Sequence, residues 1–353
     1  MYVATLVLAT VGSAGLVLPE AHASIRLSHA TSLVSNDSHL FASAEEGWSG
    51  SGQFSRGVVR TRAGAPGPWE HFGLDYVHDW DPSAPANEAL LYSYAANNYV
   101  SAEFGWSGSS RGILHARPGS TTIGPWETFY ITSNSDGTVS FAVYDSSGTQ
   151  YYVSAEEGWT GNGYGTLRAR ATSIGPWEKF VANSRFVDGH DDYPWASTTP
   201  DTWIGGWQYT RECDSFVAWK VYENDGGPAR PKSTDMTPGD YKTYSVDING
   251  PPGGIGPNAG DWAGTAPALG IAVNRTPTVG SAAQWNNNGD GGRFKVGHVA
   301  LVTAVFPDGS IDIAQYNLLE DHQYTTLHLP VGGTTFAGLP VSWPDNFIHV
   351  KGF

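Results

Sequence analysis

The strongest constraint on this chain is a sequence motif that occurs three times in its first half. The copies read "FASAEEGWSG", "YVSAEFGWSG" and "YVSAEEGWTG", and they place Glu45, Glu103 and Glu156 at separations of 58 and 53 residues. Each copy is followed by an arginine-containing stretch, "VVRTR", "ILHAR" or "TLRAR", and then by "GPWEHF", "GPWETF" or "GPWEKF". The first half is therefore built from three similar units over residues 25–182.

Within each unit, alternating apolar residues and turn-forming clusters indicate short strands joined by hairpins, with Gly-Pro marking the turn before the last strand. A unit of about 50 residues is too small to bury its own apolar face. We therefore expect the three units to close around a pseudo-threefold axis as an all-β trefoil. The repeated pattern, "Y(V/L)SAE" followed by "GPWE.F", resembles the fascin-like trefoil family, and the resemblance implies a lectin or protein-binding role.

The repeat supplies two sets of tryptophans with different expected roles. One set follows Gly-Pro in each unit, where one equivalent ring per unit suits a symmetric core: Trp69, Trp126 and Trp177. The other set lies in glycine- and serine-rich loops: Trp48, Trp106 and Trp159. These loop rings either pack within the loop or stack on the face of a sugar. The recurring glutamates and arginines are expected to form a buried ion pair inside each unit.

The charge balance excludes some partners. The 353 residues carry 34 acidic and 19 basic side chains, a formal net charge of −15, and no basic stripe. Phosphate neutralisation needs clustered Lys and Arg, so nucleic acid is not an expected partner. Attraction to anionic membranes or wall polymers is disfavoured for the same reason, and polymer binding would have to come from stacking and hydrogen bonds.

The N-terminus predicts secretion. Residues 1–23 contain an apolar run that ends in Ala21-His22-Ala23, an A-x-A type cleavage site. No Lys or Arg precedes the run, so an uncleaved anchor is the alternative. We expect a secreted monomer with no stable membrane association after signal cleavage. Outside the cell the single cysteine, Cys213, cannot form an internal disulfide, so it is buried and inert, paired between chains, or a working thiol.

The segment around the cysteine favours the working thiol. In "RECDSFVAWKVYEND", Cys213, Phe216, Val217 and Val221 are spaced like the apolar face of a helix. Cys213 then lies in the first turn, where free backbone N–H groups and the helix dipole favour a thiolate and lower the thiol pKa. The position predicts a nucleophile.

A cysteine nucleophile needs a base, and His298 in "KVGHVALVTAVF" is the informative histidine. This strand is followed by "PDGS" and a second strand, "IDIAQYN". A turn centred on Asp308-Gly309 would place Ala300 opposite Asn317, with Asn317 diagonal to His298 and Gln315 one pair further along. Cysteine, histidine and an orienting amide reproduce the logic of a catalytic triad.

Six segments in order, "DDYPW", "YTRECDSFVAWK", "PNAGDW", "VGSAAQW", "VGHVALV" and "IDIAQYN", resemble the CHAP domains. These are cysteine- and histidine-dependent amidohydrolases and peptidases with a papain-like α+β fold, and the resemblance covers about residues 190–353. It implies that Cys213 is the nucleophile and His298 the general base. The family often has an acid where Gln315 stands, with an asparagine at the position of Asn317. We expect Asn317 to orient His298, with Gln315 behind it.

Other residues are candidates for the cleft. Asp261 and Trp262 in "NAGDW" are expected to line the groove, with Trp262 either a core residue or a substrate platform. Tyr209 and Arg211 precede the nucleophile, and packing and surface charge are their simpler roles. The cluster "DGHDD" lacks metal-ligand spacing, so we expect no metal and no cofactor.

Together these patterns predict a multidomain protein. A signal peptide (1–23) is followed by an all-β trefoil (25–182), a linker and domain entry (183–205) and a papain-like α+β CHAP-like catalytic domain (206–353). The predicted function is a secreted peptidoglycan hydrolase that cleaves an amide as an N-acetylmuramoyl-L-alanine amidase or endopeptidase. Its partner would be cell-wall peptidoglycan or another glycan, bound by the trefoil. The alternatives are a catalytically silent glycan-binding lectin, motivated by Gln315, and an amidase acting on a different amide.

Overall fold

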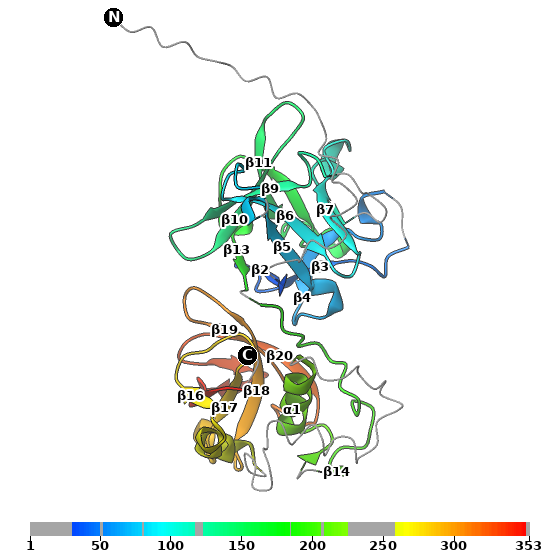
Figure 1. The fold of residues 1–353 in the computed structure, drawn as a ribbon. Coiled ribbons are helices and arrows are strands. Elements are labelled where there is room, and N and C mark those ends of the chain that lie inside the picture. The colour runs from blue at the N-terminus through cyan, green and yellow to red at the C-terminus, as the bar shows by residue number, and fades with distance from the viewer. Residues whose placement is uncertain are drawn as a thin grey trace, which may run out of the picture.

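The computed structural model shows two stacked halves joined by a single connection (Figure 1). It describes residues 30–49, 52–79, 81–116, 123–183, 185–205, 208–224 and 258–350. The expected signal peptide, 1–23, lies outside the described residues. Among the helices that are described, none combines the length and the apolar character needed to cross a membrane.

The first half consists of short antiparallel strands linked by 3-10 turns. The strands are β1 (Ala30–Thr31), β2 (Leu33–Ser35), β3 (Phe41–Ala44), β4 (Val59–Ala63), β5 (Phe72–Tyr76), β6 (Glu88–Ser93), β7 (Asn98–Ala102), β8 (Leu114–Ala116), β9 (Thr128–Ser133), β10 (Val139–Tyr144), β11 (Gln150–Ala155), β12 (Leu167–Ala171) and β13 (Phe180–Ala182). One phenylalanine from each GPWE motif is fully buried in their shared core: Phe72, Phe129 and Phe180. The region is all-β, as expected, and is consistent with a trefoil-like fold.

The three units close into a ring through one repeated backbone contact. A glycine in each unit accepts a hydrogen bond from the next unit: Gly57 from Ala116 at 2.8 Å, Gly112 from Ala169 at 2.7 Å and Gly165 from Thr61 at 2.8 Å. The three glycines have φ of 90°, 82° and 71°. A Cβ on any of them would lie within 2.3 Å of the neighbouring carbonyl oxygen, so only glycine allows this approach.

The tryptophans of the GPWE motifs are half-buried rather than inside the core as expected, although Trp126 packs against the core cluster. Each ring instead lies against the glycine that precedes the loop tryptophan: Trp69 on Gly47, Trp126 on Gly105 and Trp177 on Gly158. A Cβ on these glycines would approach the ring to 2.8, 3.5 and 3.1 Å, respectively. The glycine of each "GW" pair therefore meets the tryptophan of the "GPWE" motif in all three units, and a side chain would crowd the ring at Gly47 and Gly158 but not at Gly105.

The expected ion pairs form in the first and third units. Glu45 pairs with Arg62, and Glu156 pairs with Arg170 at 2.5 Å; both glutamates are buried. Glu103 is also buried, but Arg117, its expected partner, lies outside the described residues. The glutamate and arginine of the repeat are therefore structural.

The second half is a six-stranded antiparallel sheet with order β16-β23-β17-β18-β19-β20 and a helix packed on one face. Its elements are β14 (Trp203–Gly205), β15 (Gln208–Tyr209), α1 (Cys213–Asn224), α3 (Trp262–Thr265), β16 (Ala272–Asn274), β17 (Ala282–Trp285), α4 (Gly289–Gly292), β18 (His298–Val305), β19 (Ile311–Tyr316), β20 (Tyr324–Leu329), β21 (Thr334–Phe336), β22 (Leu339–Val341) and β23 (Asn346–His349). Phe216 and Val217 of α1 pack in one buried cluster with Val299 of β18 and Ala314 of β19. The helical apolar face predicted around the cysteine is the face that meets the sheet.

The predicted register of the β18–β19 hairpin is wrong by two residues. Leu301 pairs with Ala314, and the ladder shifts at a bulge after Val302. Pro307 has no N–H to pair with Ser310, so the turn is one residue longer than expected, and Phe306 pairs with Ser310 instead. The longer turn and the bulge each move the pairing by one residue.

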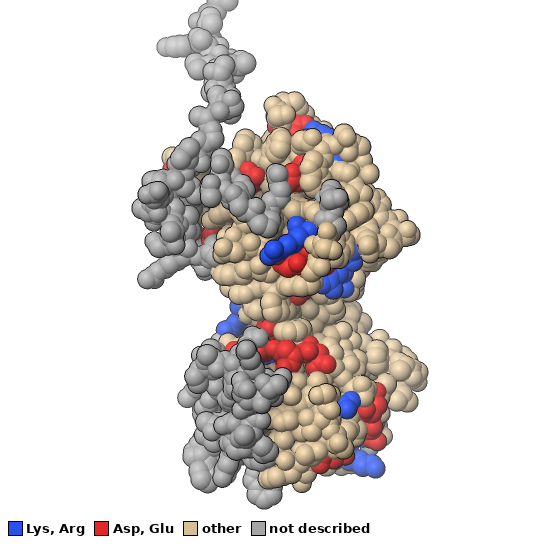
Figure 2. Space-filling view, turned by 90° about the vertical axis from the view of Figure 1, so that its right-hand side faces the viewer, with Lys and Arg blue, Asp and Glu red and all other residues tan. Residues whose placement is uncertain are grey.

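The halves touch through the connection, through a pair of stacked histidines, and through a small apolar cluster in which Val34 and Phe41 meet Phe306. The backbone N–H groups of Gly189 and His190 both donate to the Pro66 carbonyl, at 2.8 and 3.0 Å. His39 of the first half stacks on His328 of the second, with ring centroids 3.6 Å apart. Figure 2 shows one face on which Lys and Arg form isolated groups and acidic side chains gather near this junction.

Candidate active site

The predicted nucleophile, Cys213, lies where α1 begins. The Glu212 carbonyl accepts the N–H of Phe216 at 3.1 Å, so Glu212 caps the helix and Cys213 occupies its first turn, as predicted. Arg211 has a φ of 64°, which turns the chain from β15 into the helix. Cys213 is a free thiol and only 8% exposed, because it packs in the cluster between α1 and the sheet.

The expected lowering of the thiol pKa is not observed. Burial raises the pKa of Cys213 well above its usual value, and the carboxylates of Asp214 and Glu212 raise it further. The backbone N–H groups of Val299 and Asp214 oppose this shift without outweighing it. A helix N-terminus contributes about 1 kcal/mol, less than the desolvation of a buried anion. The resting thiol is therefore protonated near neutral pH, and a base must remove its proton.

The predicted base is held by a glutamine. His298, 2% exposed, is the first residue of β18, and its Nε2 lies 2.7 Å from Oε1 of Gln315 on β19. Its ring stacks on Phe294 at a centroid distance of 4.6 Å. An amide oxygen can only accept, so Nε2 carries the hydrogen and Nδ1 keeps its lone pair. The site thus fixes His298 in the tautomer of a base.

The thiol and the imidazole belong to the same end of the sheet. The Val299 N–H that faces Cys213 belongs to the residue directly after His298. Gln315 completes the group from the neighbouring strand. The structure therefore places Gln315 against His298, and Cys213 against the backbone of the residue that follows His298.

Asn317 does not have the place predicted for it. Its Nδ2 donates to Oε2 of Glu212 at 2.8 Å, and its Oδ1 accepts the backbone N–H of His322 at 2.9 Å. The two-residue register error explains the difference, since the diagonal neighbour of His298 becomes Gln315 rather than Asn317. Gln315, which was expected to lie behind Asn317, is thus the residue that hydrogen-bonds the His298 ring.

The remaining cleft candidates separate into core and surface. Trp262 is fully buried, so it is a core residue and not a platform. Asp261 is partly exposed, and its Oδ1 accepts a hydrogen bond from Asn287 at 3.2 Å. Tyr209 is 45% exposed and makes an edge-to-face contact with Trp203, which is 48% exposed. Trp203 was not predicted, although "TWIGGWQY" places it across a hairpin from Tyr209.

The tryptophans of the repeat loops are half-buried, and each has an aromatic or basic neighbour. Trp48 lies against Phe54 and under the Arg60 guanidinium. Trp106 meets His115 edge-to-face, and Trp159 lies under Arg168. Loop packing thus accounts for part of each ring, and sugar contact by the remainder stays a prediction.

Comparison with known proteins identifies the second half. Residues 204–317 match the family model described as CHAP domain. The chain contains a CHAP domain. A protein of Streptococcus mutans serotype c (strain ATCC 700610 / UA159), described as "Putative hydrolase", is 46% identical over 67 residues, which are 19% of this chain and 28% of that protein. The CHAP domain indicates a peptidoglycan-related amidase or peptidase family, and both matches support a hydrolase.

Three solved structures resemble part of the chain at low scores. The designed threefold symmetric protein ThreeFoil has a TM-score of 0.32 and 14% identity, covering 43% of this chain and 96% of its own. A mosquitocidal holotoxin has a TM-score of 0.34 and 12% identity, covering 45% and 17%. Cry35Ab1 has a TM-score of 0.30 and 14% identity, covering 45% and 36%. At these scores the likeness carries no conclusion about this chain.

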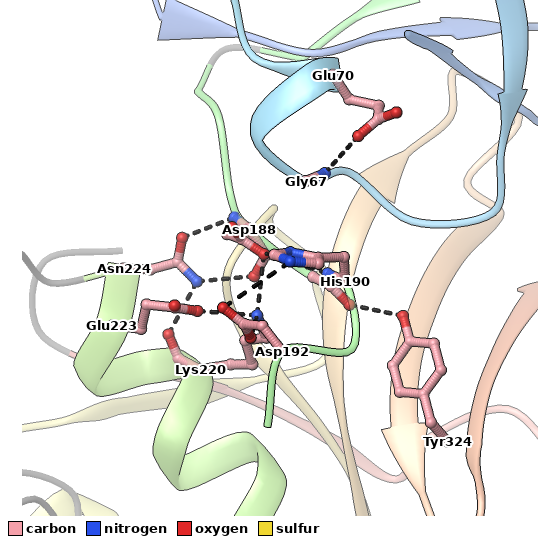
Figure 3. A network of polar contacts seen from close by, with 10 residues as sticks. Gly67, Glu70, Asp188, His190, Asp192, Lys220, Glu223, Asn224 and Tyr324 are labelled. Carbon is pink, nitrogen blue, oxygen red and sulfur yellow. Dashed lines mark hydrogen bonds and ion pairs between the residues drawn. The ribbon is translucent and has the colours of Figure 1, made fainter. Parts of the chain in front are cut away.

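A buried lysine of α1, Lys220, binds the segment that leads from the first half into the second (Figure 3). Lys220 is fully buried, and its Nζ lies 2.9 Å from Asp188 and 2.8 Å from Glu223, and also bonds Asp192. Burial alone would lower the pKa of Lys220, but the carboxylates raise it. The apolar run "FVAWKVY" already contained the signal, because its lysine falls on the buried face of the helix.

Two groups of acidic and histidine side chains in the second half each have ligand atoms within 4.8 Å of one another: Asp188, His190 and Asp192, and Asp201, Glu212 and His322. The first group belongs to the "DGHDD" cluster, which is more compact than the sequence indicated. Its carboxylates already bind the Lys220 ammonium. In the second group, Glu212 already binds Asn317 and faces His322. We therefore assign no metal to either group.

Proposed function

We propose that this protein is a secreted cysteine amidohydrolase that cleaves an amide bond of peptidoglycan, as an N-acetylmuramoyl-L-alanine amidase or an endopeptidase. The observation that carries the proposal is the buried His298–Gln315 pair at the end of the sheet where Cys213 begins its helix. The CHAP domain supplies the substrate class. A nucleophile, a base and an orienting group on separate elements are what amide hydrolysis needs.

The proposed reaction has two halves. Nδ1 of His298 takes the thiol proton as the Cys213 sulfur attacks the amide carbonyl carbon. The resulting oxyanion is stabilised by the Cys213 backbone N–H, which lies in the first turn and has no acceptor within the helix, and by one further donor. The imidazolium then gives its proton to the leaving amine as the C–N bond breaks, which leaves a thioester. Water, activated by His298, hydrolyses the thioester and restores the thiol.

We further propose that the first half is a β-trefoil that binds glycan through its loop tryptophans, and that residues 1–23 direct secretion. The closed ring of three units and the exposed parts of the loop rings support this reading. The net charge of −15 argues for contacts by stacking and hydrogen bonding rather than by ion pairing. Peptidoglycan would then be held by one half and cut by the other.

The test is digestion of purified peptidoglycan by the full chain and by its Cys213→Ala variant, followed by mass spectrometry of the soluble products. We expect release by the wild-type chain only. Free lactyl groups of muramic acid would identify an amidase, and new peptide amines an endopeptidase. Binding to the insoluble polymer by both chains without release by either would contradict the enzyme proposal.

A second candidate is a lectin whose CHAP domain is silent. Two observations favour it: Gln315 stabilises an imidazolium less than a carboxylate would, and the pKa of Cys213 is raised rather than lowered. Alkylation of the thiol separates the two candidates. A silent site would show no His298-dependent reaction of Cys213, so a His298→Ala variant would react at the wild-type rate.

A further inference from the structure

A second polar network lies beside the proposed nucleophile and base, at the start of α1. Glu212 accepts a hydrogen bond from Asn317 at 2.8 Å through Oε2, and its Oε1 lies 3.0 Å from Nδ1 of His322. The Asn317 Oδ1 accepts the backbone N–H of His322, and Nε of Arg211 donates to the His322 carbonyl at 2.8 Å. The network joins the two residues before the nucleophile to the segment that follows β19.

The backbone of this network is held in an uncommon conformation. Arg211, Asn317 and His322 have φ of 64°, 61° and 55°, in the left-handed region that L-residues rarely adopt. Asn and His adopt this region more readily than most residues, but for Arg211 it is unfavourable and persists only where surrounding contacts fix it. Here the fixing contacts are the hydrogen bonds among the same residues. The two chain segments are therefore held to each other as well as internally.

We infer that Glu212 and Asn317 form a positioning pair that holds Cys213 against His298 and Gln315. The pair is placed for this role, because Glu212 directly precedes Cys213 and Asn317 lies two residues after Gln315. One hydrogen bond thus spans the gap between the segment that carries the nucleophile and the strand that orients the base. The inference rests on the proposed function for its catalytic meaning, and it gives Asn317 a role through Glu212 rather than through the imidazole.

The charge of Glu212 gives the pair a measurable signature. Burial is the largest cause of the raised pKa of the Cys213 thiol, and the carboxylates of Asp214 and Glu212 raise it further. Among the described residues, the other charged or titratable groups around this position are Asp201, Arg211 and His322 near Glu212, Tyr193 near both carboxylates, and His298, which precedes Val299 on β18. A change at Glu212 therefore alters the pH dependence of thiol reactivity, which a purely structural contact would not do.

The test exchanges the polarity of the bond. Asn317→Asp keeps the oxygen that accepts the His322 N–H, tolerates the left-handed backbone, and replaces only the group that donates to Glu212. Glu212→Gln keeps an acceptor for Asn317 and removes the charge. The double variant E212Q/N317D restores a bond, because the amide introduced at position 212 donates to the carboxylate introduced at position 317, and it restores the total charge. Alkylation of Cys213 by iodoacetamide is followed from pH 6 to 10, with thermal melting as the folding control and peptidoglycan release as a second readout.

We expect N317D to slow alkylation at neutral pH and to reduce release by about tenfold. That fold-change corresponds to about 1.4 kcal/mol, close to the contribution of one hydrogen bond to a charged group. E212Q shifts the alkylation profile to lower pH, and the double variant recovers most of the loss in N317D.

If N317D behaves like the wild type, or if E212Q gives no recovery in a folded double variant, the positioning pair is wrong and Asn317 acts independently of Glu212. The alkylation arm is informative even if no peptidoglycan is released, so the inference and the proposed function fail separately.

Discussion

The two halves of this protein are built on opposite plans. In the first half the contact that closes the ring is made three times, at Gly57, Gly112 and Gly165. In the second half each contact is made once, as in the His298–Gln315 pair or the Lys220 network. Because the contact is repeated, the sequence reveals the plan of the first half, and each copy is expected to contribute a similar part of the stability. The single contacts of the second half depend on local details such as one bulge or one proline, and the loss of any one of them is expected to destabilise the protein more.

The largest expected effect comes from breaking a contact that occurs once. Lys220→Met leaves Asp188, Asp192 and Glu223 without their ammonium, and it should lower the free energy of unfolding by about 3–5 kcal/mol, as for other buried pairs that lose one partner. Urea unfolding measures the change. The matched control is Lys179→Met, which removes an ion pair with Asp136 at the surface and should change the free energy of unfolding much less. Equal losses in the two variants would contradict the assigned role of Lys220.

The repeated contacts should instead give equal effects. Alanine at Gly57, Gly112 or Gly165 brings a Cβ against a carbonyl oxygen at positive φ, and each substitution should cost about 2–3 kcal/mol. Gly161→Ala is the control, because Gly161 has a φ of 59° but open space around its Cβ position. It should cost only about 1 kcal/mol. A marked difference among the three ring variants would show that the units are not equivalent in the folded protein.

A smaller effect is expected at Gln315, the position where the resemblance to CHAP domains implies an acid. Gln315→Glu places a carboxylate 2.7 Å from the Nε2 position of His298 and should raise the pKa of the imidazole. The better-stabilised imidazolium should increase peptide release by about tenfold at neutral pH, in line with general acid–base catalysis. The acid limb of the kcat/KM profile should move to higher pH, because the imidazole becomes protonated at a higher pH as the solution is acidified. A fall in rate at all pH values would show that the amide is required at this position.

The smallest expected change concerns the thiol alone. The Asp214 carboxylate adds to the effect of burial in raising the pKa of Cys213. Asp214→Asn should therefore shift the pH dependence of alkylation to lower pH. The sign follows because removal of a negative charge favours the thiolate. The direction is measured by rates of iodoacetamide reaction between pH 6 and 10. A shift in the opposite direction would mean that Asp214 acts through the helix start and not through its charge.

The sequence was sufficient where a pattern has one structural solution. The spacing around Cys213 predicted a helix with the thiol in its first turn, and α1 begins at that residue. The triple motif predicted an all-β first half with paired glutamates and arginines, and two of the three pairs are present among the described residues. These features depend on periodicity, which the chain displays directly.

The sequence was insufficient where one residue changes the geometry of many. The hairpin register depended on Pro307, whose missing N–H lengthens the turn, and on a bulge after Val302 that has no sequence signature. The thiol pKa depended on the burial of Cys213, which a linear motif does not state. The role of Asn317 then followed from the register and could not be predicted correctly without it.

The two hydrogen bonds from Gly189 and His190 to the Pro66 carbonyl limit how far the second half can move from the first. The connection is fastened to the first half at Pro66 and to α1 through Asp188 and Lys220, so little slack remains between the halves (Figure 3). An enzyme tethered by a long flexible linker can sample bonds at many distances from its anchor. If the first half binds peptidoglycan as proposed, the proposed active site would lie at a fixed distance from the bound polymer, so the spacing of bonds along the polymer, and not only their chemistry, would decide which bonds are cleaved.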